Sequence, residues 1–578
     1  MQSLHADTTW TGGASQDWNN VANWSNGLPL DASANGAAII DTASGNYPVY
    51  SSGTTVTDWD IIIGSTTGQT GRLDQTAGTL SSGPGNWLIM GAGGTGTLNL
   101  SGGTLNTGEL HMARTGGSGT ATVNVGGTGT LNTTGAIIVS DGQNNVAAAQ
   151  GTLNVNSGGT VNSENDLVVS FAGGSSTFGE VNIAAGGIVN VGTTTERWMI
   201  MNTWDTAQGR LNVNGGTLVL NANTDIRFST GGWGPGSSVG TSSINLNSGA
   251  INGGGGSVID LNNNADNAVN NSLSLNGGTL TIGQIVSGKA NGSRVVNFNG
   301  GTLKAAANSA AFFASGAASA ANVQAGGAKI DSNGFNVTIG QALLNGGGGG
   351  GLTKQGSGTL TLSGSNTYTG TTSIQGGTLA LDSTGTINNT SGVSLGTGGT
   401  FDVSAKSGYT VSNLTGSGNV VGALTVSTEL AIGNSPGTVN FSSDFTLASA
   451  ATYSYEFNGG GNTADLGDVA GSLILTGSTL DLIQLGTYTI NDKFTLFAYD
   501  GALTGLFKDT NNTTLADGAT FTDGGGVWKI DYNDPTAGLN GGVSASNTYV
   551  TITAVPEPSA AMLVGGLGLL GLYRRRRV

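Results

Sequence analysis

The stretch of sequence that decides the fold reads LNLSGGTL at residues 98–105. Closely similar segments are LNVNGGTL at 211–218, LSLNGGTL at 273–280 and VNFNGGTL at 296–303. Each has two apolar residues around a polar one, then a glycine-containing turn, then a threonine and another apolar residue. Alternation with a period of two places the apolar side chains on one face of an extended chain. The segment therefore predicts a short strand, a tight turn and a second short strand.

This pattern repeats from Leu73 to Leu303 with a mean step of about 28 residues. One coil of chain per repeat would stack the apolar side chains into a continuous interior column. The leading apolar positions are Leu73, Leu98, Val123, Leu153, Val181, Leu211, Ile244, Leu273 and Val296. Helical periodicity is nearly absent, so we predict an all-β protein built as a right-handed parallel β-helix (β-solenoid). An array of antiparallel sandwiches is the structural alternative, because Asn-Gly-Gly turns also form hairpins.

Composition narrows the chemistry available to the chain. Its 578 residues include 104 glycines, no cysteine and two histidines, 9% are charged, and the net charge is −16. Without thiols there is no cysteine nucleophile, thiolate zinc site or disulfide framework, and two histidines do not make a three-histidine metal centre. The acidic balance opposes binding to nucleic acid, which needs a surplus of Lys and Arg. We predict no cofactor and no metal site.

A second type of repeat follows the glycine run 346–351. Residues 352–381 read LTKQGSGTLTLSGSNTYTGTTSIQGGTLAL. This segment resembles the autotransporter-associated β-strand repeat through Lys354, Gly356, Gly358, Thr359, Leu360, Gly364, Tyr368, Gly370 and Gly377-Thr378-Leu379. The resemblance implies a β-helical region and extends over roughly a hundred residues. An autotransporter also needs a C-terminal membrane barrel, and residues 451–553 are too few to form one, so we do not expect this chain to be an autotransporter itself.

The C-terminal end has the three parts of a sorting signal. Pro556-Glu557-Pro558 is followed by the uncharged segment 560–573 and by Arg574, Arg575, Arg576 and Arg577. The segment resembles the PEP-CTERM signal, which implies an exosortase-type processing enzyme as a partner. As a helix, residues 560–573 cover roughly 21 Å of a hydrocarbon core of roughly 30 Å, so we predict a short transmembrane helix with snorkelling arginines. The arginine cluster would stay in the cytoplasm. An ordinary tail anchor is the alternative.

Export requires a signal peptide, but residues 1–6 contain neither a basic nor an apolar region of that kind. Leu4-His5-Ala6 has the form of a cleavage-site remnant, and we expect the upstream part of a signal peptide to be missing. The predicted parts of the chain are a Trp-rich N-terminal cap at 7–56, solenoid repeats at 57–345, the autotransporter-associated repeat region at 352–450, a β-rich C-terminal cap at 451–553 and the sorting signal at 554–578.

Several residues could carry chemistry. His111 lies beside Glu109 on the face opposite Leu110 and Met112, which favours a solvated or salt-bridged histidine. Asp465 and Asp468 favour a capped turn over a calcium site. The candidate catalytic serines lie in three Gly-X-Ser-X-Gly matches, none of which is followed by a histidine as a hydrolase triad requires; they are Ser238, Ser394 and Ser435.

Tryptophans Trp10, Trp18 and Trp24 could stack on sugars, but a small cap needs them for its core. Taken together, the sequence predicts a secreted, surface-sorted, non-enzymatic β-solenoid of a Gram-negative bacterium that acts as a matrix, structural or adhesive protein. It would contact the membrane through its C-terminal helix before processing. Exopolysaccharide or cell-surface glycans are its expected ligands. The alternative function is a β-helical polysaccharide lyase or glycoside hydrolase, whose clustered carboxylates we do not find in the sequence.

Overall fold

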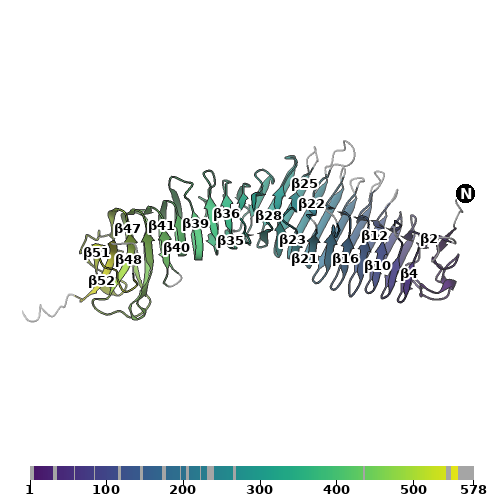
Figure 1. Cartoon of the computed structure of the whole chain (residues 1–578), viewed down its shortest axis with the longest axis horizontal. Helices are drawn as coiled ribbons and strands as arrows, with labels where there is room; N and C mark the ends of the chain where they lie inside the picture. The colour runs from purple at the N-terminus through teal and green to yellow at the C-terminus, as the bar shows by residue number, and fades with distance from the viewer. Residues whose placement is uncertain are drawn as a thin grey trace, which may run out of the picture. The chain divides into compact units, whose positions relative to one another are not determined.

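The structure is a computed structural model that describes residues 6–557, except 30–34, 58, 84, 115–118, 143–147, 172–176, 195–196, 204–206, 222, 231–239, 264–268, 434–435 and 542–547. The chain forms two compact units. Unit 1 comprises residues 1–370 and 384–389, and unit 2 comprises residues 371–383 and 390–578. Figure 1 shows stacked strands in both units.

In unit 1 each coil contributes strands to three parallel ladders. The ladder that starts each repeat contains β3 (Val49–Tyr50), β6 (Thr70–Gln75), β9 (Thr95–Leu100), β12 (Thr120–Val125), β15 (Gln150–Val155), β18 (Phe178–Ala184), β21 (Gln208–Leu220), β23 (Thr241–Asn252), β25 (Asn270–Leu275), β28 (Ser293–Phe298), β31 (Ala320–Val323) and β34 (Leu343–Asn345). β21 and β23 are long enough to contribute to the next ladder as well.

The second ladder contains β4 (Thr54–Val56), β7 (Thr79–Ser81), β10 (Thr104–Thr107), β13 (Thr130–Thr133), β16 (Thr160–Ser163), β19 (Ile188–Val191), β26 (Thr279–Ile282), β29 (Thr302–Ala305), β32 (Ala328–Asp331) and β35 (Leu352–Gln355). The third contains β1 (Ala6–Thr9), β2 (Asn35–Ile40), β5 (Ile61–Ile63), β8 (Trp87–Met90), β11 (Glu109–Met112), β14 (Ile137–Ile138), β17 (Leu167–Val168), β20 (Trp198–Ile200), β22 (Asp225–Arg227), β24 (Val258–Asp260), β27 (Gln284–Val286), β30 (Ser309–Phe313), β33 (Val337–Ile339) and β36 (Thr359–Leu362).

The predicted interior column is confirmed. All nine leading Leu, Val and Ile positions are buried, and they pair in register from coil to coil. Leu211, for example, lies between Val181 and Ile244. The pairing is parallel throughout these repeats, so the antiparallel sandwich alternative is wrong for the described coils.

Glycine in the first strand of a coil has a steric cause. Gly151 follows the turn from the previous third-ladder strand, and a Cβ there would lie 1.4 Å from the carbonyl oxygen of Val139. No side chain fits in that space, which explains why the repeats carry glycine two positions before the leading apolar residue in Q-G-T-L-N-V and Q-G-R-L-N-V. Glycine at this position therefore allows the strand to approach the backbone of Val139 closely.

Unit 2 continues parallel pairing and ends with antiparallel strands. Its parallel strands are β37 (Thr372–Ile374), β38 (Thr378–Leu381), β39 (Val393–Asp402), β40 (Tyr409–Val421), β41 (Leu424–Ile432), β42 (Thr438–Phe441), β43 (Phe445–Leu447), β44 (Thr452–Asn458), β46 (Leu466–Val469), β47 (Leu473–Gln484) and β49 (Leu503–Lys508). β44 also has an antiparallel partner, and the other strands with antiparallel partners are β45 (Thr463–Ala464), β48 (Lys493–Tyr499), β50 (Thr520–Asp523), β51 (Gly526–Asp534) and β52 (Thr548–Val555). β48 pairs in parallel with β46 on its other side.

Helical structure in the described parts consists of two single 3-10 turns, Val21–Asn23 and Gly459–Gly461. Within those parts, no helix is both long and apolar enough to cross a membrane. The predicted transmembrane helix at 560–573 lies outside the described residues.

The N-terminal tryptophans are core residues. Trp10, Trp18 and Trp24 are buried and pack edge to face, with ring centroids 5.1 Å apart for Trp10 and Trp24 and 4.8 Å apart for Trp18 and Trp24. The indole nitrogen of Trp24 donates to the carbonyl oxygen of Trp18, and that of Trp10 donates to the carbonyl oxygen of Asn46. Buried rings with these partners present no free face for stacking on a sugar.

Candidate functional site

Outward asparagines form hydrogen-bonded ladders along unit 1. In the first ladder of strands, the side-chain amide of each asparagine donates to the side-chain oxygen of the asparagine one coil earlier, at 2.8–3.0 Å. These residues are Asn99, Asn124, Asn154, Asn182, Asn212 and Asn245. The strand spacing of about 4.8 Å permits this stacking because it matches the reach of one amide to the next. The ladder is therefore a row of amides with a common orientation.

At the N-terminal end of this row, the amide of the first asparagine donates to a carboxylate. Asn99 donates to Asp74 at 2.7 Å, and Arg72 makes an ion pair with the same carboxylate at 2.7 Å. Burial alone would raise the pKa of Asp74, but the hydrogen bonds from Arg72 and Asn99 outweigh it and hold the pKa below its usual value. The charged form of Asp74 thus completes the ladder.

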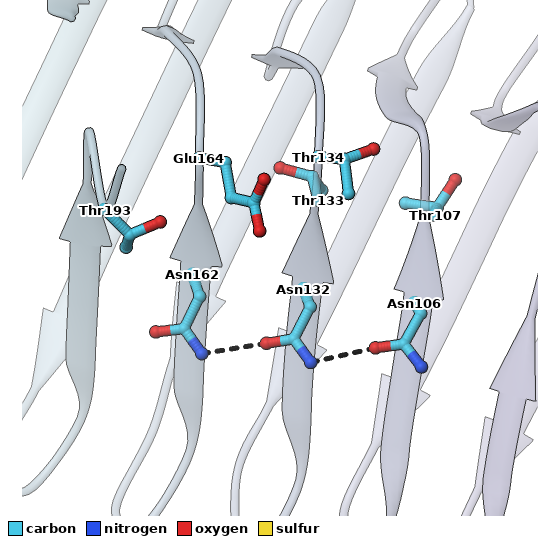
Figure 2. A pocket seen from close by; sticks show the side chains of 8 residues that line it. All are labelled: Asn106, Thr107, Asn132, Thr133, Thr134, Asn162, Glu164 and Thr193. Carbon is cyan, nitrogen blue, oxygen red and sulfur yellow. Dashed lines mark hydrogen bonds between the residues drawn. The ribbon is translucent and has the colours of Figure 1, made fainter. Parts of the chain in front are cut away.

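A second, shorter amide ladder lies on the second ladder of strands. Asn132 donates to Asn106 at 2.8 Å, Asn162 to Asn132 at 2.8 Å, and Asn190 to Asn162 at 2.7 Å. Figure 2 shows the first three of these amides in a row, with their hydrogen bonds parallel to the stacking direction. Because each amide is held by its neighbours, its remaining polar atoms have fixed positions.

These amides form one side of an open depression of about 450 Å³. Its lining consists of amides, hydroxyls and one carboxylate, contributed by successive coils: Asn106, Thr107, Asn132, Thr133, Thr134, Asn162, Glu164 and Thr193. Thr107 and Thr133 are buried, and their hydroxyls donate to the carbonyl oxygens of Glu109 and Gly135. Glu164, Thr134 and Thr193 are exposed. We call this depression the asparagine groove.

Unit 2 carries a depression of the same chemical type. Its volume is about 380 Å³, and Asn440 donates to Asn419 across it at 3.0 Å. The lining is again hydroxyls, amides and glycines, namely Thr397, Gly398, Ser417, Gly418, Asn419, Gly437, Thr438 and Asn440. None of these eight described residues is charged, so they offer hydrogen bonding.

His111 is salt-bridged, as predicted, but it is not solvated. It is 3% exposed, and its Nδ1 and Nε2 lie 2.7 Å from Asp141 and 2.8 Å from Glu109. Its ring packs on Trp87 with centroids 4.6 Å apart, and the guanidinium of Arg114 lies 4.3 Å from the Trp87 ring centroid. Both ring nitrogens are used within the protein, so neither is free for a metal or a substrate. Asp141, 30 residues from His111 in sequence, is the partner that sequence reasoning missed.

Asp465 caps a turn rather than facing Asp468. It is fully buried, and its two oxygens accept hydrogen bonds from the backbone amides of Gly437 and Glu456 at 3.1 and 3.0 Å. Burial raises its pKa to about 7 against these two hydrogen bonds. Among the residues that the structure describes, no three His, Asp or Glu side chains are grouped as metal ligands.

Lys354 explains part of the repeat resemblance. Its side chain is fully buried, and Nζ donates to Ser332 Oγ and to the carbonyl oxygens of Gln355 and Gly356 at 2.8–2.9 Å. Desolvation lowers its pKa to about 8. Gly356 has φ of +77°, which favours glycine, and a Cβ there would lie 2.4 Å from Asp331 Oδ1. Lys354 and Gly356 therefore shape a turn.

The sorting motif begins where β52 ends. Val555 is the last residue of β52, and Pro556 and Glu557 are exposed. Pro558 and the arginines Arg574–Arg577 lie outside the described residues. Of the candidate serines, Ser394 lies on β39 between Ser373 and Thr415 on the neighbouring strands, while Ser238 and Ser435 are not described.

Two family models match short parts of the chain. Residues 352–381 match the passenger-associated-transport-repeat, and residues 554–577 match the PEP-CTERM protein-sorting motif. Both resemblances seen in the sequence are thereby confirmed. The sorting motif implies processing by an exosortase and a cell-surface or extracellular location.

A curated relative is the "Adhesin BmaC autotransporter" of Brucella suis biovar 1 (strain 1330). The alignment extends over 255 residues at 32% identity, with 38% of this chain and 7% of the adhesin covered. The chain thus matches a small part of the length of this relative. This chain is therefore a surface-sorted β-solenoid that is distantly related to an autotransporter adhesin.

Proposed function

We propose that the chain is a non-enzymatic adhesive or structural protein of the cell surface or extracellular matrix, and that its solenoid binds polysaccharide. In this proposal it crosses the inner membrane of a Gram-negative bacterium and is held by its C-terminal segment. An exosortase-type enzyme then processes it near Pro556-Glu557-Pro558. The relationship to an adhesin supports the general class.

The asparagine groove is the observation that carries the binding proposal. Its amides are oriented by the ladder before any ligand arrives, which reduces the ordering cost of binding. Successive coils repeat the same groups at the strand spacing of about 4.8 Å. A polymer with regularly spaced hydroxyl groups fits such a surface, because each sugar unit meets a similar set of donors and acceptors.

The charge of the groove favours neutral or amino sugars. Among the described residues of its lining, Glu164 is charged, and the chain has a net charge of −16. Both oppose the binding of uronic-acid or sulfated polymers through like-charge repulsion. An amino group could pair with Glu164, whereas a carboxylate would face it.

The binding test uses the purified full chain on immobilised neutral, amino and acidic polysaccharides. Asn132→Ala should weaken binding roughly tenfold, the size expected for losing a hydrogen-bonding group from a prearranged site. Asn182→Ala is the matched control, because it interrupts the other amide ladder without lining the groove. Equal losses in both variants, or binding only to acidic polymers, would contradict the proposal.

The non-enzymatic part of the proposal has its own test. Incubation with neutral, pectin-like, alginate-like and sulfated polysaccharides should yield no cleavage products. The His111 cluster supports this expectation, since its carboxylates already partner the histidine. Turnover that is abolished by changing one acidic residue would favour the alternative, a β-helical lyase or glycoside hydrolase.

The sorting part can be tested on protein from the native host. Mass spectrometry should find a mature C-terminus upstream of Arg574, and changing Pro556-Glu557-Pro558 should leave unprocessed protein in the membrane. Removing Arg574–Arg577 should instead weaken membrane retention and orientation. Surface protein that still ends at Val578 would point to a plain tail anchor.

A further inference from the structure

The distance between the folded end of unit 2 and the proposed membrane segment is short. β52 ends at Val555, and the uncharged segment begins at Ala560. Five peptide steps span at most about 18 Å even when fully extended. The interfacial layer on each side of a bilayer is roughly 5–8 Å thick. A tail inserted at Ala560 therefore holds the end of β52 close to the lipid headgroups.

Exposed apolar side chains surround that end of β52. Ile490 is 55% exposed, and the residue after it, Asn491, donates its backbone amide to the carbonyl oxygen of Ala554 at 2.8 Å. Leu539 is 41% exposed, and its backbone amide donates to the carbonyl oxygen of Lys493. Lys493 is the strand partner of Thr553 in the antiparallel pairing of β48 with β52. Both apolar residues thus flank the last three residues of β52.

A third exposed residue belongs to the same loop as Ile490. Leu485 is 44% exposed and directly follows β47. The loop is held against the start of β51 by Tyr488, whose ring packs on Trp528 with centroids 4.8 Å apart and whose hydroxyl donates to the carbonyl oxygen of Gly525 at 3.3 Å. Trp528 in turn pairs with Ala554. We call Leu485, Ile490 and Leu539 the exit rim.

We propose that the exit rim rests on the lipid surface while the C-terminal segment is still attached, and that it seats unit 2 with Pro556 and Glu557 at the membrane interface. This inference rests on the membrane stage of the proposed function. The rim side chains lack polar groups, as expected for residues that enter the headgroup region. Asp492 lies two residues after Ile490, and Glu557 lies two residues after the end of β52, so the lipid that this region fits has headgroups without net negative charge.

Seating would serve the processing step. A tail attached by a few extended residues alone would leave the motif free to take many orientations relative to the membrane. Contact through the rim fixes the direction in which the chain leaves β52, and so presents the motif to a membrane-embedded enzyme in one orientation.

The test uses the absence of native cysteine. Thr487→Cys, in the exposed loop between Leu485 and Ile490, is labelled with a fluorophore, and the full chain is reconstituted in phosphatidylcholine–phosphatidylethanolamine vesicles with a quencher on the lipid. We expect quenching to roughly halve the emission, since interfacial apolar groups lie about 5–10 Å deep in the headgroup boundary. Adding Ile490→Glu and Leu539→Glu should remove most of the quenching.

Two control reporters separate the possible failures. Ser407→Cys, exposed and near the start of β40, should not be quenched. Tyr573→Cys reports on the tail. A quenched tail with an unquenched Thr487→Cys refutes the seating alone, whereas an unquenched tail refutes the membrane stage and the seating with it. A disulfide dimer through Thr487→Cys without vesicles would assign the rim to a second copy and also overturn the proposal.

Discussion

The middle coils of unit 1 and the C-terminal end of unit 2 fill their interiors with different kinds of side chains. In unit 1 the interior is largely Leu, Val and Ile, and outward amides bond from coil to coil. At the end of unit 2 large aromatic rings fill the interior, as in the contacts of Phe457 and Tyr488 with Trp528 at 5.0 and 4.8 Å. Antiparallel strands β48, β51 and β52 lie there.

The difference follows from the presence or absence of a next coil. A middle coil is covered on both sides by copies of itself, so small repeated side chains suffice. The last described coil of unit 2 lacks such a neighbour. Large aromatic side chains, some of which carry a polar group, cover its open end instead. Tyr532 illustrates this, because its buried hydroxyl donates to the carbonyl oxygen of Leu515 and accepts from the backbone amide of Phe507. We expect the buried tryptophans at the N-terminal end of unit 1 to perform the same task.

The most damaging change should be a charge inside the repeated coils. Leu211→Asp places a carboxyl group between Val181 and Ile244 and should cost about 5 kcal/mol of local stability. Hydrogen exchange should become faster in the coils around β21. The increase should be smaller in more distant coils, because each coil contacts only its neighbours. Gln208→Asp, exposed on the same strand, is the control and should change little.

The corresponding change in unit 2 should destabilise the strands β48, β51 and β52 together. Trp528→Ala leaves a cavity beside Phe457, Tyr488 and Phe494 and should cost about 4 kcal/mol. We expect faster hydrogen exchange in β48, β51 and β52 together. Trp198→Ala, which removes a 40% exposed ring, should cost far less. Similar losses for the two variants would contradict the assignment of Trp528 to a closing core.

The two regions should also differ in their response to pH. The pKa of Asp465 is raised from 3.8 to about 7 by burial, so the folded chain keeps its proton where the unfolded chain has lost it. The contribution of Asp465 to the stability of unit 2 is therefore fully present below about pH 4 and is lost progressively as pH rises to about 7, by on the order of 3 kcal/mol. Asp465→Asn should flatten this slope in urea unfolding measured at several pH values. An unchanged slope, or the same flattening in Asp481→Asn, would speak against this origin.

The smallest effect should come from breaking one amide contact. Asn132→Val removes a donor to Asn106 and an acceptor for Asn162. Both partners are half-buried and can turn to water, and valine favours strands, so we expect a loss of about 1 kcal/mol or less. Thermal unfolding measures the change, and Asn182→Val provides the same interruption in the other ladder. A loss of several kcal/mol would mean that the ladders carry much of the stability.

The amide ladders could have been predicted from the sequence. Asparagine stands between the two apolar residues in LNL at 98–100 and in LNV at 153–155, and one fixed position per coil is the signal for a ladder. Periodicity predicted which residues point inward because the side-chain period of a strand is two. It left open which outward groups touch, since that depends on how many residues each coil contains.

Amino-acid order by itself determined the parallel solenoid, its interior positions and the sorting motif, because each rests on local spacing or on a contiguous pattern. Only the tertiary structure decided that His111 is buried between Glu109 and Asp141, that Asp465 caps the turn at Gly437, and that Ile490 and Leu539 flank the end of β52. Those contacts join residues from different coils or loops, and their partners are set by the length and path of every intervening segment. A period in the sequence fixes which face a side chain occupies, whereas the stacking of coils fixes what it meets there.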